Sequence, residues 1–239
     1  MSPSGRSPIV AHPPTQADIL GWRPQLARRS GQQATVTNPI CEPDWEGAHV
    51  LAHFDGRRRA PDGGAWLHLV DTDGEDVTDQ EPGLLDEIRR SVLAEDAVID
   101  GFVTDQATRT GEGATIAQTM KGKHLSLLTN RIGEVVPQPL TGHDRDHLTA
   151  FVAVDLLRVD GQDLLDVPLL ERKRLLDGLL AVGDRVRVSV YTRPPVKPWL
   201  LTWLAAGFSG VILKSSNGRY RPTTVADDWA VTTRLQGQR

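Results

Sequence analysis

The histidines are the first residues whose type and spacing could support chemistry. His143 and His147 are four residues apart, a spacing that would let two imidazoles bind one metal ion from a single helix face. The residues between them are Asp-Arg-Asp, which does not match the His-Glu-x-x-His pattern of zinc enzymes, so a polar surface loop is favoured. His49 and His53 would share one face of a strand, but no third ligand is apparent. We therefore predict no metal site.

Other common catalytic patterns are missing from the sequence. Residues 111–117 (GEGATIA) have the glycines of a phosphate-binding loop but lack the Lys-Ser/Thr that should follow them. No nucleophile elbow is present. The single cysteine, Cys41, excludes an intrachain disulfide and a cysteine-rich zinc site. The stretch that remains of interest is CEPDWEGAH at 41–49, in which the acids Asp44 and Glu46 flank a tryptophan and precede a glycine.

The composition is that of an ordinary soluble protein. Of the 239 residues, 39% are hydrophobic and 24% are charged, and the formal net charge is −4. A protein that binds DNA autonomously usually carries a basic excess, so this balance argues weakly against strong DNA binding. The N-terminus does not resemble a signal peptide, and no apolar stretch approaches the length of a membrane span. We expect a cytoplasmic protein with no membrane association.

The chain divides into three parts by composition. Residues 1–40 are rich in proline and predict a mostly irregular arm, with a short helix around 16–20 and a solvated basic cluster at 23–29. Residues 41–234 carry the patterns of a folded domain, and 235–239 form a tail.

Strand and helix patterns are mixed without regular alternation across the folded part. Period-two or continuous apolar patterns predict strands at 48–59, 65–74, 97–105, 148–161, 185–192 and 209–216. Helical spacing predicts helices at 82–96, 167–180 and 197–207. Asp-Gly pairs predict tight turns after the strands, at 55–56, 73–74 and 160–161. This arrangement indicates an α+β fold with largely antiparallel sheets flanked by helices.

Four segments, in this order, resemble the adenylation domain of ATP-dependent DNA ligases. They are EPDWEG (42–47), VIDGFVTD (98–105), FVAVDLLRVDGQDLLDVPLLERKRLL (151–176) and AAGFSGVILKSSNGRYRP (205–222). The resemblance extends over most of the chain, and its last two segments are similar to the bacterial branch of the family. It implies the ligase nucleotidyltransferase fold, an ATP pocket and a requirement for magnesium.

The resemblance also implies which residues stand at the pocket positions. In the family a lysine attacks the α-phosphate of ATP and holds AMP covalently, and Asp44 stands at this lysine's position. A carboxylate is a poor phosphoryl acceptor here and repels a triphosphate. Glu46 replaces the family's aspartate two residues later, and Gly47 is retained. His49 replaces an arginine that holds substrate.

The other pocket positions show similar losses. Phe102 stands for the glutamate that bonds the ribose, Val154 for the aromatic that stacks on adenine, and Ser209 for the acid that helps to place the metal. Lys214 is retained among the groups that contact phosphate. Loss of one electrostatic stabiliser costs about 10²–10³ in rate, and loss of the nucleophile removes the covalent route. We therefore expect no catalytic residue and no cofactor.

These losses predict a catalytically degenerate ligase homologue, a pseudo-ligase, that binds or scaffolds in a DNA-repair context. Acids are expected to make the pocket electronegative: Asp44, Glu46, Asp55, Asp100 and Asp155. The alternative is an active ligase or nucleotidyltransferase that uses ATP, magnesium and a relocated lysine, Lys214 or Lys121. A second alternative is a module that binds DNA ends. A repair protein or nicked DNA are the expected partners, and no OB-fold domain is expected after residue 234.

Overall fold

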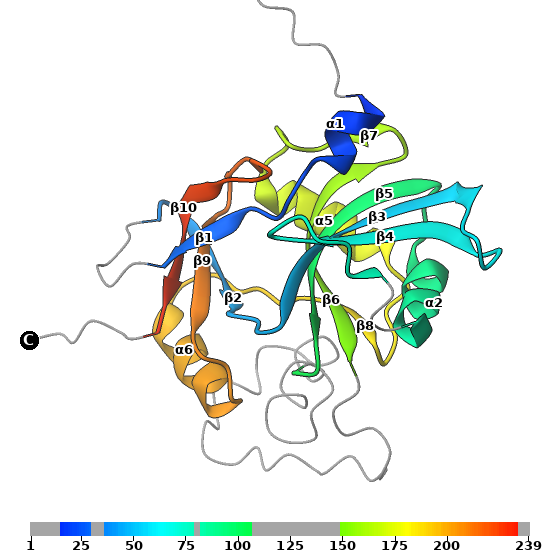
Figure 1. Ribbon diagram of the computed structural model, residues 1–239. Helices are drawn as coiled ribbons and strands as arrows, with labels where there is room; N and C mark the ends of the chain where they lie inside the picture. The colour runs from blue at the N-terminus through cyan, green and yellow to red at the C-terminus, as the bar shows by residue number, and fades with distance from the viewer. Residues whose placement is uncertain (1–14, 30–35, 79–81, 107–148, 234–239) are drawn as a thin grey trace, which may run out of the picture.

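The computed structural model describes residues 15–29, 36–78, 82–106 and 149–233, and in these ranges the chain builds two β-sheets (Figure 1). The small sheet has four strands in the order β1 (Leu26–Arg29), β10 (Val225–Thr232), β9 (Val211–Ser215) and β2 (Pro39–Pro43). The large sheet has six: β4 (Ala65–Asp71), β3 (Ala48–Arg59), β5 (Asp96–Thr104), β6 (Ala150–Val159) and β7 (Gln162–Asp163) in order, with β8 (Val186–Val188) paired to β6. Only β1–β10 and β6–β8 are parallel pairs among these strands. The predicted α+β fold with largely antiparallel sheets is confirmed.

Four helices pack against these sheets in the described ranges. The helices of the described ranges are α1 (Gln16–Leu20), α2 (Pro82–Ser91), α5 (Leu169–Leu179) and α6 (Val196–Ala205). Helices α2 and α5 pack on the large sheet, and α6 lies beside the small sheet near β2 (Figure 1). None of the helices in the described part of the chain is long and apolar enough to cross a membrane.

Strand β3 shows why the large sheet is buried on both faces. Successive side chains of a strand point to opposite faces. Val50, Ala52 and Phe54 join the core that includes residues of α2 and α5. Leu51 lies on the opposite face and packs with Tyr220, Trp229 and other residues from the small sheet and its connections. One face of β3 therefore packs against helices α2 and α5, and the other face packs against the small sheet.

The turn prediction at residues 55–56 is wrong. Strand β3 continues through Asp55 and Gly56 to Arg59, and its pairing with β4 shifts register after Asp55. The chain turns instead around Asp62 and Gly63, where glycine has a φ of 84°. The turn at 160–161 is confirmed, because Asp160 and Gly161 both have positive φ values, 46° and 80°.

The N-terminal segment is more ordered than its composition predicts. The helix expected at 16–20 is confirmed as α1, which begins with a capping box between Thr15 and Asp18. Residues 26–29 form β1, and the expected boundary at residue 41 falls inside β2. The interpretation of 23–29 as a solvated basic cluster is wrong for Arg23, which donates to two backbone carbonyls, and Gln25 of the same segment is buried. Arg28 is exposed, as that interpretation expects.

Some expectations lie outside the described residues. These are the histidines His143 and His147, and Lys121. The period-two pattern at 185–192 yields a strand only at its start, β8. Lys197 is exposed on α6.

His53 makes the stability of the fold sensitive to acid. Its side chain is buried opposite His68 of β4, and neither ring nitrogen has a hydrogen-bond partner among the described residues. Burial, with smaller contributions from His68 and Arg23, lowers the pKa of His53 to about 3. The unfolded chain, in which histidine titrates near its ordinary value of about 6.5, therefore binds more protons than the folded chain between these two pH values. Stability should fall as pH drops through this window.

The variant His53→Leu tests this effect. Wild-type protein should lose about 1.4 kcal/mol of unfolding free energy per pH unit in this window through His53. The free energy of unfolding of His53→Leu should fall by about 1.4 kcal/mol less per pH unit than that of the wild type. At pH 7 the variant should be as stable as the wild type, because neither ring nitrogen of His53 makes a hydrogen bond that leucine would lose. Urea denaturation at pH 7, 6, 5 and 4.5 measures the two slopes. Equal slopes would contradict the assignment.

Candidate functional site

A cavity of about 830 Å³ lies between the two sheets. Strands β1, β9 and β10 of the small sheet form one side, and His49 of β3 and Phe102 of β5 contribute from the large sheet. The β2–β3 connection supplies part of the wall. The lining residues are Gln25, Leu26, Ala27, Arg28, Asp44, Trp45, Glu46, Gly47, His49, Phe102, Ser209, Ile212, Lys214, Val225, Trp229 and Val231.

Seven of the eight residues that the sequence assigns to the pocket line this cavity. They are Asp44, Glu46, Gly47, His49, Phe102, Ser209 and Lys214. Val154 is the exception. It is buried in a core cluster with Trp199 and Trp203 of α6, and Phe102 packs against that cluster.

Asp44 directly follows β2, and its contacts include two hydrogen bonds. Its backbone N–H donates to the carbonyl of Gly210 at 3.0 Å. The hydroxyl of Ser209 donates to its carboxylate at 3.2 Å. Only 3% of Asp44 is exposed, while Ser209 is exposed. The two positions at which the resemblance implies a nucleophilic lysine and a metal-placing acid thus hold a carboxylate and a hydroxyl that bond to each other.

Gly47 is required by the backbone of the same connection. It has a φ of 109°, a conformation that side chains rarely adopt, and a Cβ here would lie 2.4 Å from the carbonyl oxygen of Val103. Because backbone blocks the added atom, Gly47→Ala should lower the free energy of unfolding by about 3 kcal/mol. Urea denaturation measures the loss. Gly63→Ala serves as the control, because Gly63 also has a positive φ but no atom lies within 4 Å of the added Cβ, so this variant shows the cost of backbone strain without a steric clash. Equal losses in the two variants would contradict the steric argument.

His49 is oriented by a carboxylate behind it. Its Nε2 lies 2.6 Å from Oδ1 of the fully buried Asp100. The imidazole stacks on Phe102, its cross-strand neighbour, with ring centroids 4.3 Å apart and planes 9° apart. Tyr220 donates to the other Asp100 oxygen at 2.7 Å and accepts from the backbone N–H of Gln25. Burial, then the charge of Asp100, raises the pKa of Tyr220 well above its usual value, so the phenol remains a donor.

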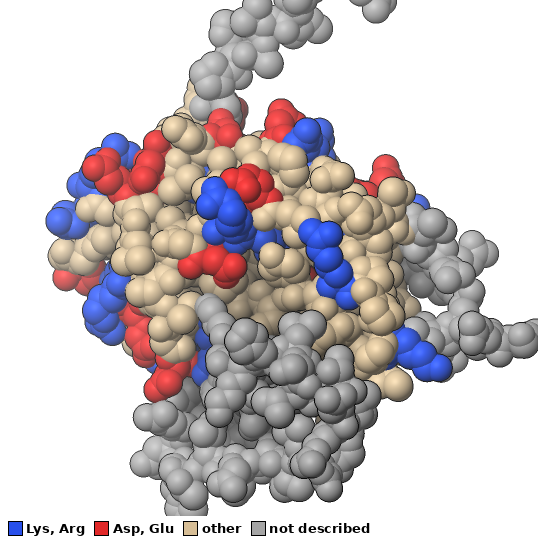
Figure 2. Space-filling model, turned by 180° about the vertical axis from the view of Figure 1, so that it is seen from behind, with Lys and Arg blue, Asp and Glu red and all other residues tan. Residues whose placement is uncertain are grey.

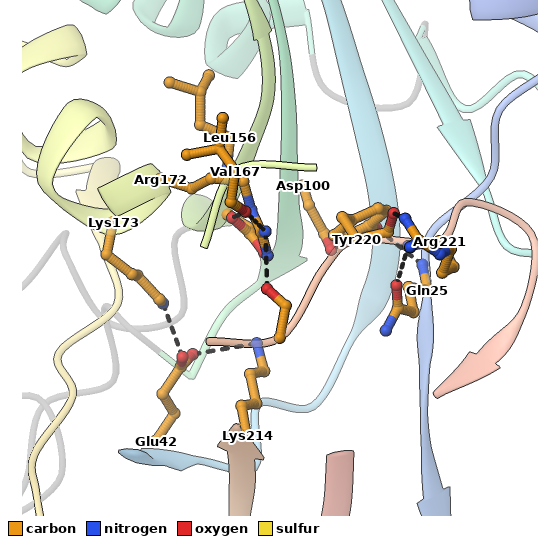
Figure 3. A network of polar contacts seen from close by, with 12 residues as sticks. Gln25, Glu42, Asp100, Leu156, Val167, Arg172, Lys173, Lys214, Tyr220 and Arg221 are labelled. Atoms are coloured by element: carbon orange, nitrogen blue, oxygen red, sulfur yellow. Dashed lines mark hydrogen bonds and ion pairs between the residues drawn. The ribbon is translucent and has the colours of Figure 1, made fainter. Parts of the chain in front are cut away.

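Lys214 shares a buried carboxylate with a second lysine (Figure 3). Its Nζ lies 3.3 Å from Oε2 of Glu42 and 4.2 Å from the centroid of the Trp229 ring. Nζ of Lys173, from α5, approaches Oε1 of Glu42 at 2.7 Å, as an ion pair without hydrogen-bond alignment. All three charged groups are at most 2% exposed. Burial outweighs the attraction of Glu42 and lowers the pKa of Lys173.

A second buried ion pair lies beside this cluster. Arg172 of α5 donates from Nε and Nη2 to the two carboxylate oxygens of Asp155 at 2.8 and 2.7 Å. Both residues are 0% exposed. Arg172 also donates to the carbonyls of Val167 and Gly218. Asp155 therefore acts in the core, holding α5 to β6, and does not line the cavity.

The acids expected around the pocket have four different surroundings. Asp44 and Glu46 line the cavity, and Asp100 lies behind His49. Asp155 is paired with Arg172. Asp55 lies in the outer part of β3, where it accepts from the backbone N–H groups that follow it.

Sequence reasoning missed the buried charges of α5. Arg172 and Lys173 are three and four residues after the buried Leu169, and the buried Leu176 follows at the next turn. These positions form the inward face of the helix. The sequence did carry a signal for this burial, since two charged residues stand at positions where an amphipathic helix places apolar ones. The carboxylates that pair with them, Glu42 and Asp155, come from β2 and β6.

The comparisons with known proteins agree with this fold. The family model described as "ATP dependent DNA ligase domain" matches residues 28–230. A DNA ligase of Natronomonas pharaonis is 27% identical over 190 residues, covering 79% of this chain and 30% of that protein. A probable DNA ligase of Mycobacterium sp. strain KMS is 41% identical over 76 residues, covering 31% of this chain and 15% of that protein. The chain thus spans less than a third of these relatives' length.

Solved structures show the same architecture. The ligase domain of Mycobacterium tuberculosis LigD has a TM-score of 0.58 and 21% identity, covering 89% of this chain and 59% of that one. A mycobacterial DNA ligase D complexed with ATP and MES has a TM-score of 0.59 and 20% identity, covering 89% and 60%. At this identity the likeness concerns the fold. Together with the family match over most of its length, it shows that the chain belongs to the ATP-dependent DNA ligase domain family.

Proposed function

We propose that this chain is a catalytically degenerate ligase adenylation domain that binds or scaffolds partners in DNA repair and does not transfer nucleotides. One observation carries the proposal. Asp44, at the position where the resemblance places the nucleophilic lysine, lies in the wall of the cavity and accepts a hydrogen bond from Ser209. A carboxylate has no amine nitrogen, so it cannot form the phosphoramidate through which the resemblance implies that AMP is held.

The surrounding residues support the same proposal. Asp44 and Glu46 would repel the phosphates of ATP, and Ser209 offers a hydroxyl where the resemblance implies a metal-placing acid. Lys214, the retained phosphate-contacting group, is held at 3.3 Å from Glu42, a carboxylate that it shares with Lys173. These residues do not fit ATP and magnesium well, so the proposed function requires neither.

Incubation with α-labelled ATP and a divalent metal ion tests the proposal. We expect no acid-labile, covalent protein–AMP adduct, while an active ATP-dependent ligase assayed in parallel becomes labelled. Thermal denaturation with and without ATP and magnesium gives a second readout, because a ligand that binds only the folded state raises the melting temperature. Appearance of a stoichiometric adduct would sink the proposal.

The presence of a lysine in the cavity wall favours one alternative, an active ligase with a relocated nucleophile. Lys214 lines the cavity, and the amine of Lys173 lies on the same carboxylate behind it. If an adduct does form, the variants Lys214→Ala, Lys173→Ala and Lys121→Ala identify its site. In that case one of the three should abolish labelling, and the other two should retain it.

A DNA-end-binding role would require a surface that attracts phosphate. On the face shown in Figure 2, basic and acidic side chains are interspersed among the described residues. We expect no difference between nicked and intact duplex in gel shifts at low ionic strength. Nick-specific binding that weakens steeply with added salt would favour the DNA-end-binding module instead.

A further inference from the structure

Helix α6 carries apolar side chains on the face that points away from the core. Its buried side, with Trp199 and Trp203, packs into the core cluster that includes residues of β6. The residues of the other side are Pro198, Leu201, Leu204 and Ala205, all exposed. Leu201 and Leu204 are 53% and 37% exposed, and their spacing of three residues puts them on one face. Apolar residues gathered on one exposed face mark an interaction site, whereas single exposed ones do not.

The charges beside this face are of one sign. Arg193 precedes α6 and Lys197 lies in its first turn, and both are exposed. Neither forms an ion pair with a carboxylate of the described residues. The sequence contains no aspartate or glutamate from 185 to 226, and the acids of the neighbouring β2 segment, Glu42 and Asp44, are buried. The face therefore complements an apolar surface that is bordered by acids.

The fold presents this face on a fixed helix. Trp199 and Trp203 pack against each other with ring centroids 5.7 Å apart, and both are buried. A surface that is already ordered loses little conformational entropy when a partner binds to it. The ten residues of α6 extend for about 15 Å, which matches a partner helix of about three turns lying alongside.

We propose that the outer face of α6 is a docking surface for a protein partner, and that the partner presents an amphipathic helix with leucine-type side chains bordered by Asp or Glu. The inference rests on the proposed binding function and names the surface and the chemistry of the partner. The partner's apolar side chains cover Leu201 and Leu204, and its acids pair with Lys197 and Arg193. A second copy of this chain fits less well, because a symmetric contact through α6 would bring bases and no acids to these positions.

Two fluorescein-labelled peptides with the same apolar face provide the probe. The acidic peptide is EELLEALLEE and the basic one is KKLLKALLKK, and fluorescence anisotropy follows the titration with the full chain. The acidic peptide should bind in a saturable way, with a Kd of about 0.1–1 mM. The basic peptide should bind at least about tenfold more weakly, because its lysines meet Lys197 and Arg193. Added salt should reduce this difference.

Matched variants locate the contact. Leu201→Gln should weaken binding of the acidic peptide about five- to tenfold. Leu93→Gln removes a leucine that is 63% exposed outside α6 and should leave binding unchanged. The double variant Arg193→Glu/Lys197→Glu should reverse the preference and bind the basic peptide more tightly. Circular dichroism should be the same for all variants, since the substituted residues are exposed. Equal affinity for the two peptides, no effect of Leu201→Gln, or no saturable binding would each overturn the proposal.

Three measurements detect other occupants of the face. A dimer in sedimentation that Leu201→Gln dissociates would assign it to a second copy. Binding to phosphatidylglycerol vesicles that Leu201→Gln abolishes would assign it to a membrane surface, and displacement of the acidic peptide by a short DNA duplex would assign it to nucleic acid. Each of these results would refute the proposed partner.

Labelling with ATP on the same preparation keeps the docking proposal distinct from the proposed function. A protein–AMP adduct would refute the degenerate function whatever the peptide result. Failure of peptide binding without an adduct would refute the docking surface alone.

Discussion

Arg172→Met is expected to lower the free energy of unfolding by about 3–5 kcal/mol, because it leaves Asp155 buried without its counter-charge. The pair is bidentate and 0% exposed on both sides. The variant also loses the donors that reach the carbonyls of Val167 and Gly218. Urea denaturation followed by circular dichroism measures the change in stability.

The helix offers a matched control two residues further on. Arg174 pairs with Glu171, but its side chain is 68% exposed, and solvent-exposed ion pairs contribute little to stability. Arg174→Met should therefore change the urea midpoint little. The double variant Arg172→Met/Asp155→Leu should recover much of the loss, since it removes both charges. Similar losses for the two arginine variants would contradict the buried-pair explanation.

Glu42→Gln is expected to be comparably destabilising, by about 3–5 kcal/mol, because two buried ammonium groups lose the one carboxylate between them. The pKa of Lys173 is already lowered by burial in the native protein. Without Glu42 it should fall further below its unfolded value, so the unfolded chain binds more protons over a wider range of pH. The loss of stability should therefore shrink as pH rises from 7 toward 10.

Urea denaturation at pH 7, 8.5 and 10 tests this prediction. Adding Lys173→Met to Glu42→Gln should restore part of the stability at pH 7 and flatten the pH dependence, because one of the two buried charges is gone. The variant Glu171→Gln, at an exposed position, serves as the control and should leave the urea midpoint nearly unchanged. A pH-independent loss in Glu42→Gln would contradict a role for the lysine charges.

The large sheet was predictable because its strands carry local signals. The strands at 48–59, 97–105 and 148–161 match β3, β5 and β6 closely, and the positive φ values of Asp160 and Gly161 follow from their position in a tight turn. Asp55-Gly56 misled the prediction. The same dipeptide is tolerated inside β3 because the pairing with β4 is irregular there.

The small sheet was only partly predictable. β9 carries a clear apolar run, but β1 has the sequence LARR and β10 contains adjacent acids, Asp227 and Asp228. Strand formation in both depends on pairing between segments about 200 residues apart, with Arg28 bonded to Asp227 across the pair. The strand propensity of a short segment does not reveal a pairing partner that lies so far away in the sequence.

By itself, the sequence determined the family, the α+β class and which residue types stand at the pocket positions. These are properties of side-chain identity and of short-range periodicity. Only the tertiary structure decided which of those residues share a cavity, that Val154 packs in the core instead, and that Asp44 and Ser209 bond to each other. It also decided that Glu42 is shared by Lys173 and Lys214. The reason is physical: the energy of a charge depends on its burial and on partners from distant segments, and both arise only when the sheets pack.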